Sequence, residues 1–240
     1  MKRRRLSCLA ILLTLAVAGA VGPSSAQAKR GWWGIQSDAG GAWTNAATTV
    51  TFSTYGPAPA GDVWYSTDAG ASWTKGGSVS VAAPSDHSND GVHDIEYRFV
   101  DGSANVLRSG FCQVKIDTTG PDCFAPGVSC VEGGVCRIPF LIADCRYLPE
   151  NQILPFSPTA HATLAIYRNA KIRGKWTQVP LRTVDLGWRP TNVFAEESWI
   201  FYDWPCDLPP GGYWYEIRAT DEAGNPHNHA DDSPLTVTRS

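Results

Sequence analysis

An internal repeat constrains the fold of this 240-residue chain more than any other feature of its sequence. Residues 91–105 (GVHDIEYRFVDGSAN) align without gaps on residues 211–225 (GGYWYEIRATDEAGN), at an offset of 120 positions. The identical pairs are Gly91/Gly211, Glu96/Glu216, Arg98/Arg218, Asp101/Asp221 and Asn105/Asn225. Self-similarity at this spacing predicts two copies of one structural unit.

Alternating apolar and polar residues predict that each copy is made of β-strands. Ile95, Tyr97 and Phe99 would share one face of a strand over residues 94–99. The same alternation occurs over residues 49–52, 112–116, 213–218 and 235–238. No long stretch repeats at the helical period of 3.6 residues, so we expect an all-β protein whose strands have one buried face and one wet face.

Two upstream hairpins extend the repeat. Residues 63–74 (VWYSTDAGASWT) correspond to residues 165–177 (AIYRNAKIRGKWT), with Tyr65 matching Tyr167 and Trp73 matching Trp176. The copies are separated at residues 117–122 (DTTGPD), where polar residues, Gly and Pro favour a linker or sharp turn between domains.

The first 28 residues read as a cleaved signal peptide. Lys2 to Arg5 form a positive n-region, residues 6–21 are largely apolar, and residues 26–28 (AQA) form a small-x-small cleavage site. We therefore expect an exported protein, located outside the cell, whose mature chain starts near Lys29.

Charge argues against nucleic acid as a partner. Residues 1–28 contain four basic and no acidic residues, so 16 Lys and Arg and 23 Asp and Glu remain, a net charge of −7. A polyanion-binding protein is expected to show an excess of Lys and Arg. No later apolar run is long enough to span a bilayer, so no membrane span is expected in the mature chain.

Six cysteines remain in the mature chain: Cys112, Cys123, Cys130, Cys136, Cys145 and Cys206. An even number in an exported chain predicts disulfides, and six cysteines allow 15 connectivities. The pair predicted here is Cys130 with Cys136, because Gly133 and Gly134 between them can reverse the chain tightly. The other four cysteines are not assigned.

The two copies resemble the bacterial immunoglobulin-like repeats of secreted and surface proteins. The first copy carries this resemblance through residues 43–45 (WTN), 65–68 (YSTD), 93–98 (HDIEYR) and 115–121 (KIDTTGP), and the second through residues 212–215 (GYWY) and 219–225 (ATDEAGN). The resemblance implies two tandem immunoglobulin-like β-sandwich domains over residues 43–119 and 120–240. A Gly/Trp-rich segment, residues 29–42, would precede them.

A second resemblance points to an enzyme. Ser66, Asp68, Gly70 and Trp73 have the spacing of a sialidase Asp-box, and Arg137-Ile138-Pro139 resembles a signature of the same enzymes. A propeller needs at least four blades of roughly 40 to 50 residues, and the chain has one such box. The favoured interpretation is a hairpin turn made by Asp68 and Gly70.

Other catalytic or metal-binding patterns are weak. Glu196 and Glu197 are adjacent and would point to opposite faces of an extended chain, so they do not form a glycosidase pair. His227, His229 and Asp231 would share one face of an extended segment and could hold a divalent cation. The alternative for these three is a solvated loop, and no cofactor is otherwise expected.

Aromatic residues leave room for a binding function. All 10 Trp lie in the mature chain. Core packing is expected for Trp64, Trp73, Trp176 and Trp214. Core packing and ligand contact both stay open for the candidate binding residues, which are Trp32, Trp33, Trp188, Trp199 and Trp204. The sequence therefore predicts a non-catalytic extracellular module pair that spaces or binds a glycan or protein partner at the cell surface. The alternative is a small secreted enzyme, or a carbohydrate-active accessory protein, whose site has no recognisable motif.

Overall fold

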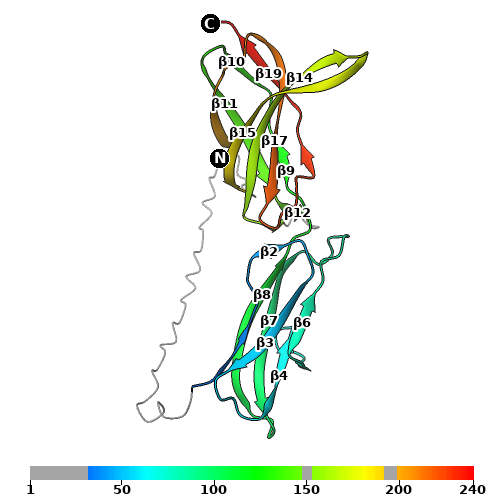
Figure 1. Ribbon diagram of the computed structural model, residues 1–240, viewed down its shortest axis with the longest axis vertical. Coiled ribbons are helices and arrows are strands. Elements are labelled where there is room, and N and C mark those ends of the chain that lie inside the picture. Colours follow the sequence, from blue (N-terminus) through cyan, green and yellow to red (C-terminus); the bar gives the residue numbers. More distant parts are fainter. Residues whose placement is uncertain (1–31, 148–152, 192–198) are drawn as a thin grey trace, which may run out of the picture.

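The computed structural model describes residues 32–147, 153–191 and 199–240. The described residues form strands and turns without any helix, so they contain no helix that could cross a bilayer. This confirms the all-β prediction. The strands form two β-sandwiches stacked end to end (Figure 1). Residues 1–28, Glu196 and Glu197 lie outside the described part of the chain.

The first sandwich comprises a three-stranded sheet and a five-stranded sheet. The smaller sheet has the order β1 (Gly34–Ser37), β3 (Thr48–Tyr55), β6 (Ser78–Val81). The larger has the order β2 (Trp43–Thr44), β8 (Val106–Ile116), β7 (Gly91–Asp101), β4 (Gly61–Ser66), β5 (Thr74–Lys75). β1 lies within the N-terminal segment that the sequence placed before the first domain.

Alternate residues of these strands fill the first core. Ile95, Tyr97 and Phe99 on β7 are all buried, as the alternation predicts. The core cluster also takes residues from the facing sheet and from β8, namely Val50, Phe52, Val81, Val114 and Ile116. The intervening residues of each strand face the solvent, which fits sheets that are wet on one side.

The second sandwich repeats this arrangement with longer strands. One sheet has the order β10 (Val128–Val131), β19 (Ser233–Thr238), β17 (Gly211–Asp221), β14 (Thr159–Ile172), β15 (Lys175–Pro190). The facing sheet has the order β16 (Ile200–Pro205), β11 (Val135–Ala143), β9 (Asp122–Phe124), β18 (His229–Ala230). A separate pair joins β12 (Cys145–Tyr147) to β13 (Ile153–Pro155).

The two five-stranded sheets have equivalent strand orders. In each, an early strand runs parallel to the last strand: β2 beside β8, and β10 beside β19. β7 and β17 begin and end at positions exactly one repeat apart, Gly91–Asp101 and Gly211–Asp221. The sequence repeat is thus a repeat of backbone path as well.

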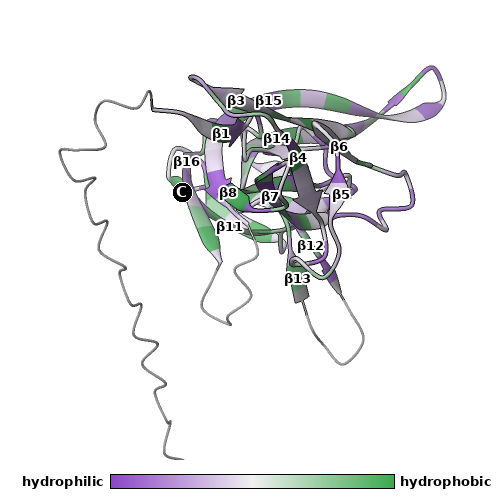
Figure 2. Ribbon diagram, turned by 90° about the horizontal axis from the view of Figure 1, so that it is seen from below, coloured by the Kyte–Doolittle hydropathy of each residue, from purple (hydrophilic) through white to green (hydrophobic). Residues whose placement is uncertain are grey.

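The β14–β15 hairpin extends beyond the sandwich as an arm, defined here as residues 168–179. Figures 1 and 2 both show it projecting sideways from the stacked sandwiches. Arg173 and Gly174 make the turn with φ of 49° and 82°. Two successive positive φ values belong to the tight turn that matches the twist of a two-stranded ribbon.

The core of the second sandwich contains a thiol cluster. Cys130, Cys136 and Cys206 are buried and are free thiols in this structure. The Cys130 sulfur lies 3.4 Å from the Cys206 sulfur. Cys206 is thus a second candidate partner for Cys130, beside the predicted Cys136.

A buried hydrogen-bond network joins the two sandwiches. Asn45 Nδ2 donates to Asn225 Oδ1 at 3.1 Å, and Asn225 Nδ2 donates to the Asp117 carbonyl at 2.8 Å. Ser157 Oγ donates to Asp117 Oδ2 at 2.6 Å. Gly120 lies against the Pro226 carbonyl so closely that a Cβ would overlap it. Within residues 117–122, predicted as a linker or sharp turn, Asp117, Gly120 and Pro121 are buried and the other three are partly buried.

Candidate functional site

Three tryptophans lie on the outer face of the β10-β19-β17-β14-β15 sheet. Trp188 on β15 pairs with His161, Trp214 on β17 pairs with Tyr167, and Trp176 on β15 pairs with Lys171. These three partners occupy odd-numbered positions of β14, so they share one face of that strand. The even-numbered residues Ala160, Ala162, Leu164 and Ile166 point the other way, into the core. We call the surface carrying the three rings the tryptophan face.

The three rings are exposed and spread along the sheet. Their exposed fractions are 57% for Trp188, 37% for Trp214 and 73% for Trp176. At about 3.3 Å per strand residue, their partners on β14 lie about 20 Å and about 13 Å apart along the strand. A ligand that touches all three must be extended.

Two shallow hollows lie between the rings. One, of about 260 Å³, is lined by residues that include His161, Thr163 and Thr220. The other, of about 240 Å³, is lined by residues that include Tyr167, Gln178 and Thr183. Arg218 lines both hollows. The tryptophan face therefore alternates aromatic rings with hydrogen-bonding side chains.

Polar contacts hold the side chains of the face in place. Arg218 forms an ion pair with Glu216, and the Tyr167 hydroxyl donates a hydrogen bond to Asp232. Burial raises the pKa of Tyr167, so this hydroxyl keeps its proton. His161 Nε2 lies 3.2 Å from Asp185 Oδ1, and the His161 ring meets Trp188 edge to face at 5.7 Å. A side chain fixed in this way, such as Trp188, loses little freedom when it binds a ligand.

Sequence reasoning misplaced three tryptophans. Trp204 was a candidate binding residue, but it is 3% exposed, because it pairs with Cys136 on the inward face of β16 and β11. Trp176 and Trp214 were expected in the core, but they stand on the outward faces of β15 and β17. Alternation shows which residues share a face, without showing which face is covered.

The remaining predicted tryptophans lie away from the tryptophan face. Trp32 is 79% exposed and packs its ring on Tyr55 at 5.0 Å, while Trp33 is partly buried against Phe99 and Arg108. Both belong to the first sandwich. The five predicted tryptophans therefore do not form one site.

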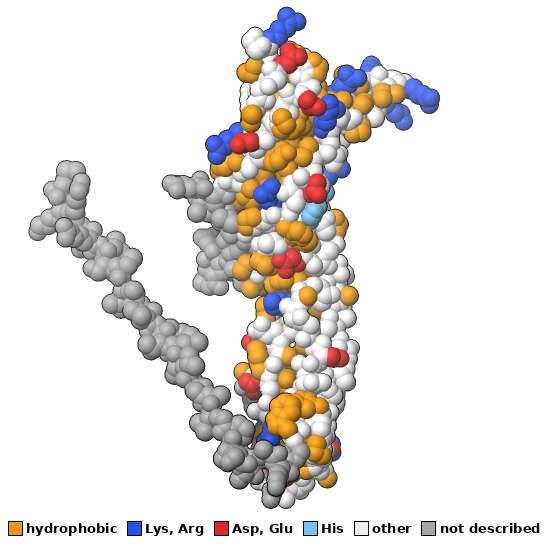
Figure 3. All heavy atoms as spheres, turned by 60° about the vertical axis from the view of Figure 1, so that its left-hand side comes forward, with side chains coloured by type: hydrophobic (Ala, Val, Ile, Leu, Met, Phe, Trp, Pro, Cys, Tyr) orange, Lys and Arg blue, Asp and Glu red, His pale blue; other side chains and the backbone are white. Residues whose placement is uncertain are grey.

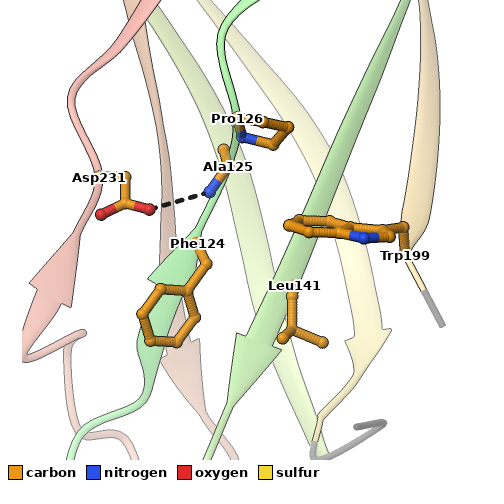
Figure 4. A pocket seen from close by; sticks show the side chains of 6 residues that line it. All are labelled: Phe124, Ala125, Pro126, Leu141, Trp199 and Asp231. Carbon is orange, nitrogen blue, oxygen red and sulfur yellow. Dashed lines mark hydrogen bonds between the residues drawn. The ribbon is translucent and has the colours of Figure 1, made fainter. Parts of the chain in front are cut away.

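Trp199 borders a hollow of about 480 Å³ on the other sheet of the second sandwich. Figure 4 shows its ring above Leu141, with Phe124 nearby and Asp231 at the opposite side. Asp231 Oδ2 accepts a hydrogen bond from the Ala125 amide at 3.3 Å. The lining is mainly apolar, so this hollow lacks the convergent polar groups found on the tryptophan face.

The predicted metal residues are only partly assembled. His229 Nε2 lies 2.9 Å from Asp231 Oδ1 in an exposed pair. His227 instead lines the hollow beside His161. In the described part of the chain, His227, His229 and Asp231 do not bring their ligand atoms within 4.8 Å of one another as a group.

A different acidic group lies at the junction between the sandwiches. Asp117, Asp144 and Asp221 are at most 2% exposed, and a carboxylate oxygen of each lies within 4.8 Å of the others. Carboxylate oxygens are the donors that hard divalent cations prefer. The sequence could not reveal this cluster, because the three residues come from three separate segments.

Protons neutralise part of this acidic cluster. Burial, followed by the nearby carboxylates of Asp117 and Asp221, raises the pKa of Asp144 to about 9. Burial raises the pKa of Asp117 to about 6, although a hydrogen bond from Ser157 opposes the shift. Burial likewise raises the pKa of Asp221. At neutral pH, Asp144 therefore remains protonated.

The Asp-box sequence forms a hairpin turn between β4 and β5. Ser66 Oγ donates to Asp68 Oδ1 at 2.7 Å, and Trp73 Nε1 donates to the Gly70 carbonyl at 3.0 Å. Hydrogen bonds from Ser72 and Ser66 lower the pKa of Asp68 to about 2. Arg98 stacks on Trp73 at 3.8 Å. The turn is held by its own polar groups and borders a sandwich rather than a propeller blade.

Comparisons with known proteins leave the family open. No protein-family profile matches the chain, and no curated protein matches it. Among solved structures, the fibronectin(III)-like modules of Clostridium thermocellum CbhA align over 85% of this chain and 94% of theirs, with 9% identity and a TM-score of 0.39. The D00-D0 domain of intimin aligns over 86% and 100%, with 8% identity and a TM-score of 0.36.

The adhesin InvE of Yersinia pseudotuberculosis aligns over 86% of this chain and 58% of its own, with 10% identity and a TM-score of 0.34. These alignments are too distant to transfer a function.

Proposed function

We propose that this protein is an exported, non-catalytic module pair whose second sandwich binds an extended glycan on the tryptophan face. The observation that carries this proposal is the alignment of Trp188, Trp214 and Trp176 on one outer sheet face. Flat aromatic rings offer large contact area with little loss of conformational freedom, and the polar groups between them can hydrogen-bond sugar hydroxyls.

A glycan fits this face better than a protein partner does. Protein interfaces gather apolar residues into a central patch surrounded by a polar rim. Here the rings stand about 13 to 20 Å apart, judged from strand spacing. The two hollows between the positions of Trp188 and Trp214 contain hydrogen-bonding side chains. That alternation suits a linear polymer with repeated apolar faces and hydroxyl edges.

The alternative of a small secreted enzyme lacks a matching site in the described residues. An active site is expected where a cleft contains titratable groups with shifted pKa values. The carboxyls with raised pKa, Asp117, Asp144 and Asp221, are buried at the junction and line none of the three hollows described above. We therefore propose that the first sandwich and the junction position the second sandwich without taking part in a reaction.

The test is a glycan array probed with the mature chain and with single tryptophan variants. Trp188→Ala and Trp214→Ala should each weaken retention by about tenfold, since losing one stacked ring costs about 1 to 2 kcal/mol. Trp32→Ala is the matched control, because this ring is exposed on the first sandwich. Retention that is equally weakened by Trp32→Ala, or unchanged by Trp188→Ala and Trp214→Ala, would contradict the proposal.

A further inference from the structure

The arm concentrates positive charge in a chain that is otherwise acidic. It carries Arg168, Lys171, Arg173 and Lys175. The whole stretch from residue 159 to residue 184 contains no Asp or Glu. A local charge of one sign creates a field that attracts an oppositely charged partner, whatever the net charge of the chain.

The cations of the arm are available to a partner. All four side chains are exposed. None of them forms an ion pair with another described residue, whereas Arg182 and Arg218 nearer the sandwich pair with Asp207 and Glu216. Figure 3 shows Lys and Arg gathered on the projecting hairpin. A bound anion would therefore not have to displace an internal carboxylate.

The arm continues the tryptophan face. Lys171 lies directly across from Trp176, and the next outward pair toward the sandwich is Asn169 with Gln178. Gln178 also lines the hollow that contains Arg218. Amide, aromatic and cationic groups therefore follow one another along this face as far as Lys171 and Trp176. Arg173 in the turn, and Lys175 paired with Ile172 on the opposite face, lie just beyond them at the tip of the arm.

We propose that the ligand of the tryptophan face is an acidic polysaccharide, whose anionic groups bind Lys171, Arg173 and Lys175 while a sugar ring lies on Trp176. This inference rests on the proposed function and adds the charge of the ligand. Charge-assisted hydrogen bonds from Lys and Arg to carboxylate, sulfate or phosphate oxygens are shorter and stronger than neutral ones.

Two other polyanions fit the arm less well. Successive nucleic-acid bases lie about 3.4 Å apart along a strand, whereas the rings of the tryptophan face are separated by about 13 Å or more. An anionic bilayer would contact the tip alone, where Ile172 and Trp176 are the exposed large apolar residues. It would leave Trp188 and Trp214 unused.

The test compares a polymer with its uncharged form. Polygalacturonate and its fully methyl-esterified form share a backbone and differ in charge. At low salt, the mature protein should bind the acid form at least tenfold more tightly than the ester. Parallel binding experiments with dextran sulfate and poly(glycerol phosphate) show whether the protein also binds a polymer that carries sulfate or phosphate in place of carboxylate.

Two triple variants test whether the cations of the arm cause the preference for the acid form. The triple variant Lys171→Gln, Arg173→Gln, Lys175→Gln should lose the preference for the acid form and keep its binding of the ester. Its slope of log affinity against log salt should become shallower by about 2, at roughly 0.7 per contact as for a flexible single-stranded polyanion. The control triple variant removes equal charge elsewhere, through Lys75→Gln, Arg108→Gln and Arg239→Gln, and should behave as the parent protein does.

The outcomes separate the two proposals. Equal binding of both polymers that depends on Trp214 would overturn the acidic ligand and leave the glycan function standing. Retention of no polysaccharide would overturn both. Tighter binding to DNA or to vesicles rich in phosphatidylserine than to any of the acidic polysaccharides would overturn the inference in favour of those partners.

Discussion

The two sandwiches share a strand order, yet they surround the same turn with different environments. The turn Asp101–Asn105 lies at the free end of the first sandwich, and its repeat Asp221–Asn225 lies at the junction. Asn105 N donates to Asp101 Oδ1 at 2.9 Å, and Asn225 N donates to Asp221 Oδ1 at 2.8 Å. Local sequence therefore reproduces local geometry.

The carboxyl groups of the two turns nevertheless have opposite pKa shifts. Hydrogen bonds from Asn105 lower the pKa of the partly exposed Asp101. Burial raises the pKa of Asp221, although Asn225 makes the equivalent bonds. Position in the tandem, rather than the motif itself, decides the direction in which the pKa of this carboxyl shifts. Four predictions test this difference between the sandwiches.

The largest expected effect concerns the thiol cluster, which only the second sandwich contains in its core. When oxidised glutathione accepts the two electrons, we expect Cys130 and Cys206 to form the disulfide, since their sulfurs are 3.4 Å apart. The long loop closed by this bond should stabilise the second sandwich by about 4 kcal/mol, against about 2 kcal/mol for Cys130–Cys136. Urea unfolding with and without reductant measures the difference.

Peptide mapping without reduction identifies the bond, and Cys112→Ser is the control because Cys112 belongs to the first sandwich. A peptide linking Cys130 to Cys136 would support the pairing predicted from the sequence and contradict the one expected here.

The next effect distinguishes the two copies of the turn. Asn225→Ala should lower the free energy of unfolding by about 3 kcal/mol, because it removes hydrogen bonds to the Asp221 carboxylate and to the carbonyls of buried Asp117 and partly buried Thr119. Asn105→Ala should cost about 1 kcal/mol, because water can replace its partners. Chemical denaturation of both variants gives the comparison. Equal decreases in the free energy of unfolding would mean that burial at the junction does not strengthen the hydrogen bonds of Asn225.

A third prediction uses two glycines. Gly120→Ala should cost about 2 kcal/mol, because the new Cβ would overlap the Pro226 carbonyl. Gly102→Ala, beside the free-end turn, should change stability by less than about 0.5 kcal/mol, because no atom lies within 4 Å of its Cβ position. Thermal unfolding of both variants is the measurement. A decrease of similar size in the melting temperatures of the two variants would show that the junction is loosely packed.

The last prediction concerns how the stability of the junction depends on pH. The folded chain keeps a proton on Asp144 to about pH 9, whereas an unfolded Asp releases it near pH 4. The free energy of unfolding should therefore fall by about 1.4 kcal/mol for each pH unit between these values, with Asp117 adding to the slope up to about pH 6.

Asp144→Asn should remove the slope between pH 6 and 9. Asp101→Asn should leave that slope intact, because the lowered pKa of Asp101 stabilises the fold only above its unfolded pKa and is lost on acidification. A slope that survives Asp144→Asn would assign the proton to another group.

The repeat and the alternation predicted much of the fold. Strand positions such as residues 94–99 and 213–218 fall inside β7 and β17, and the copies have equivalent sheet orders. These features depend on local pattern, which a sequence displays directly. The same pattern explains why the Asp-box stretch was correctly interpreted as a turn.

Features that depend on which face is covered were not predictable. Trp176 and Trp204 were assigned to the wrong environments, because the alternation of apolar and polar residues does not show which face of a strand is buried. The acidic cluster depends on contacts among Asp117, Asp144 and Asp221, which no local pattern records. The basic arm could have been found from the absence of acidic residues between 159 and 184, but net charge averaged over the chain concealed it.

Hydrogen bonds at the junction connect the two sandwiches. Asn225 bonds Asp117 and Asn45, so bending at the junction would have to break these hydrogen bonds. The arm projects from the second sandwich, well away from the first (Figure 1). Under the proposed function, a polymer bound by the arm would therefore be held away from the first sandwich, at a distance set by the junction.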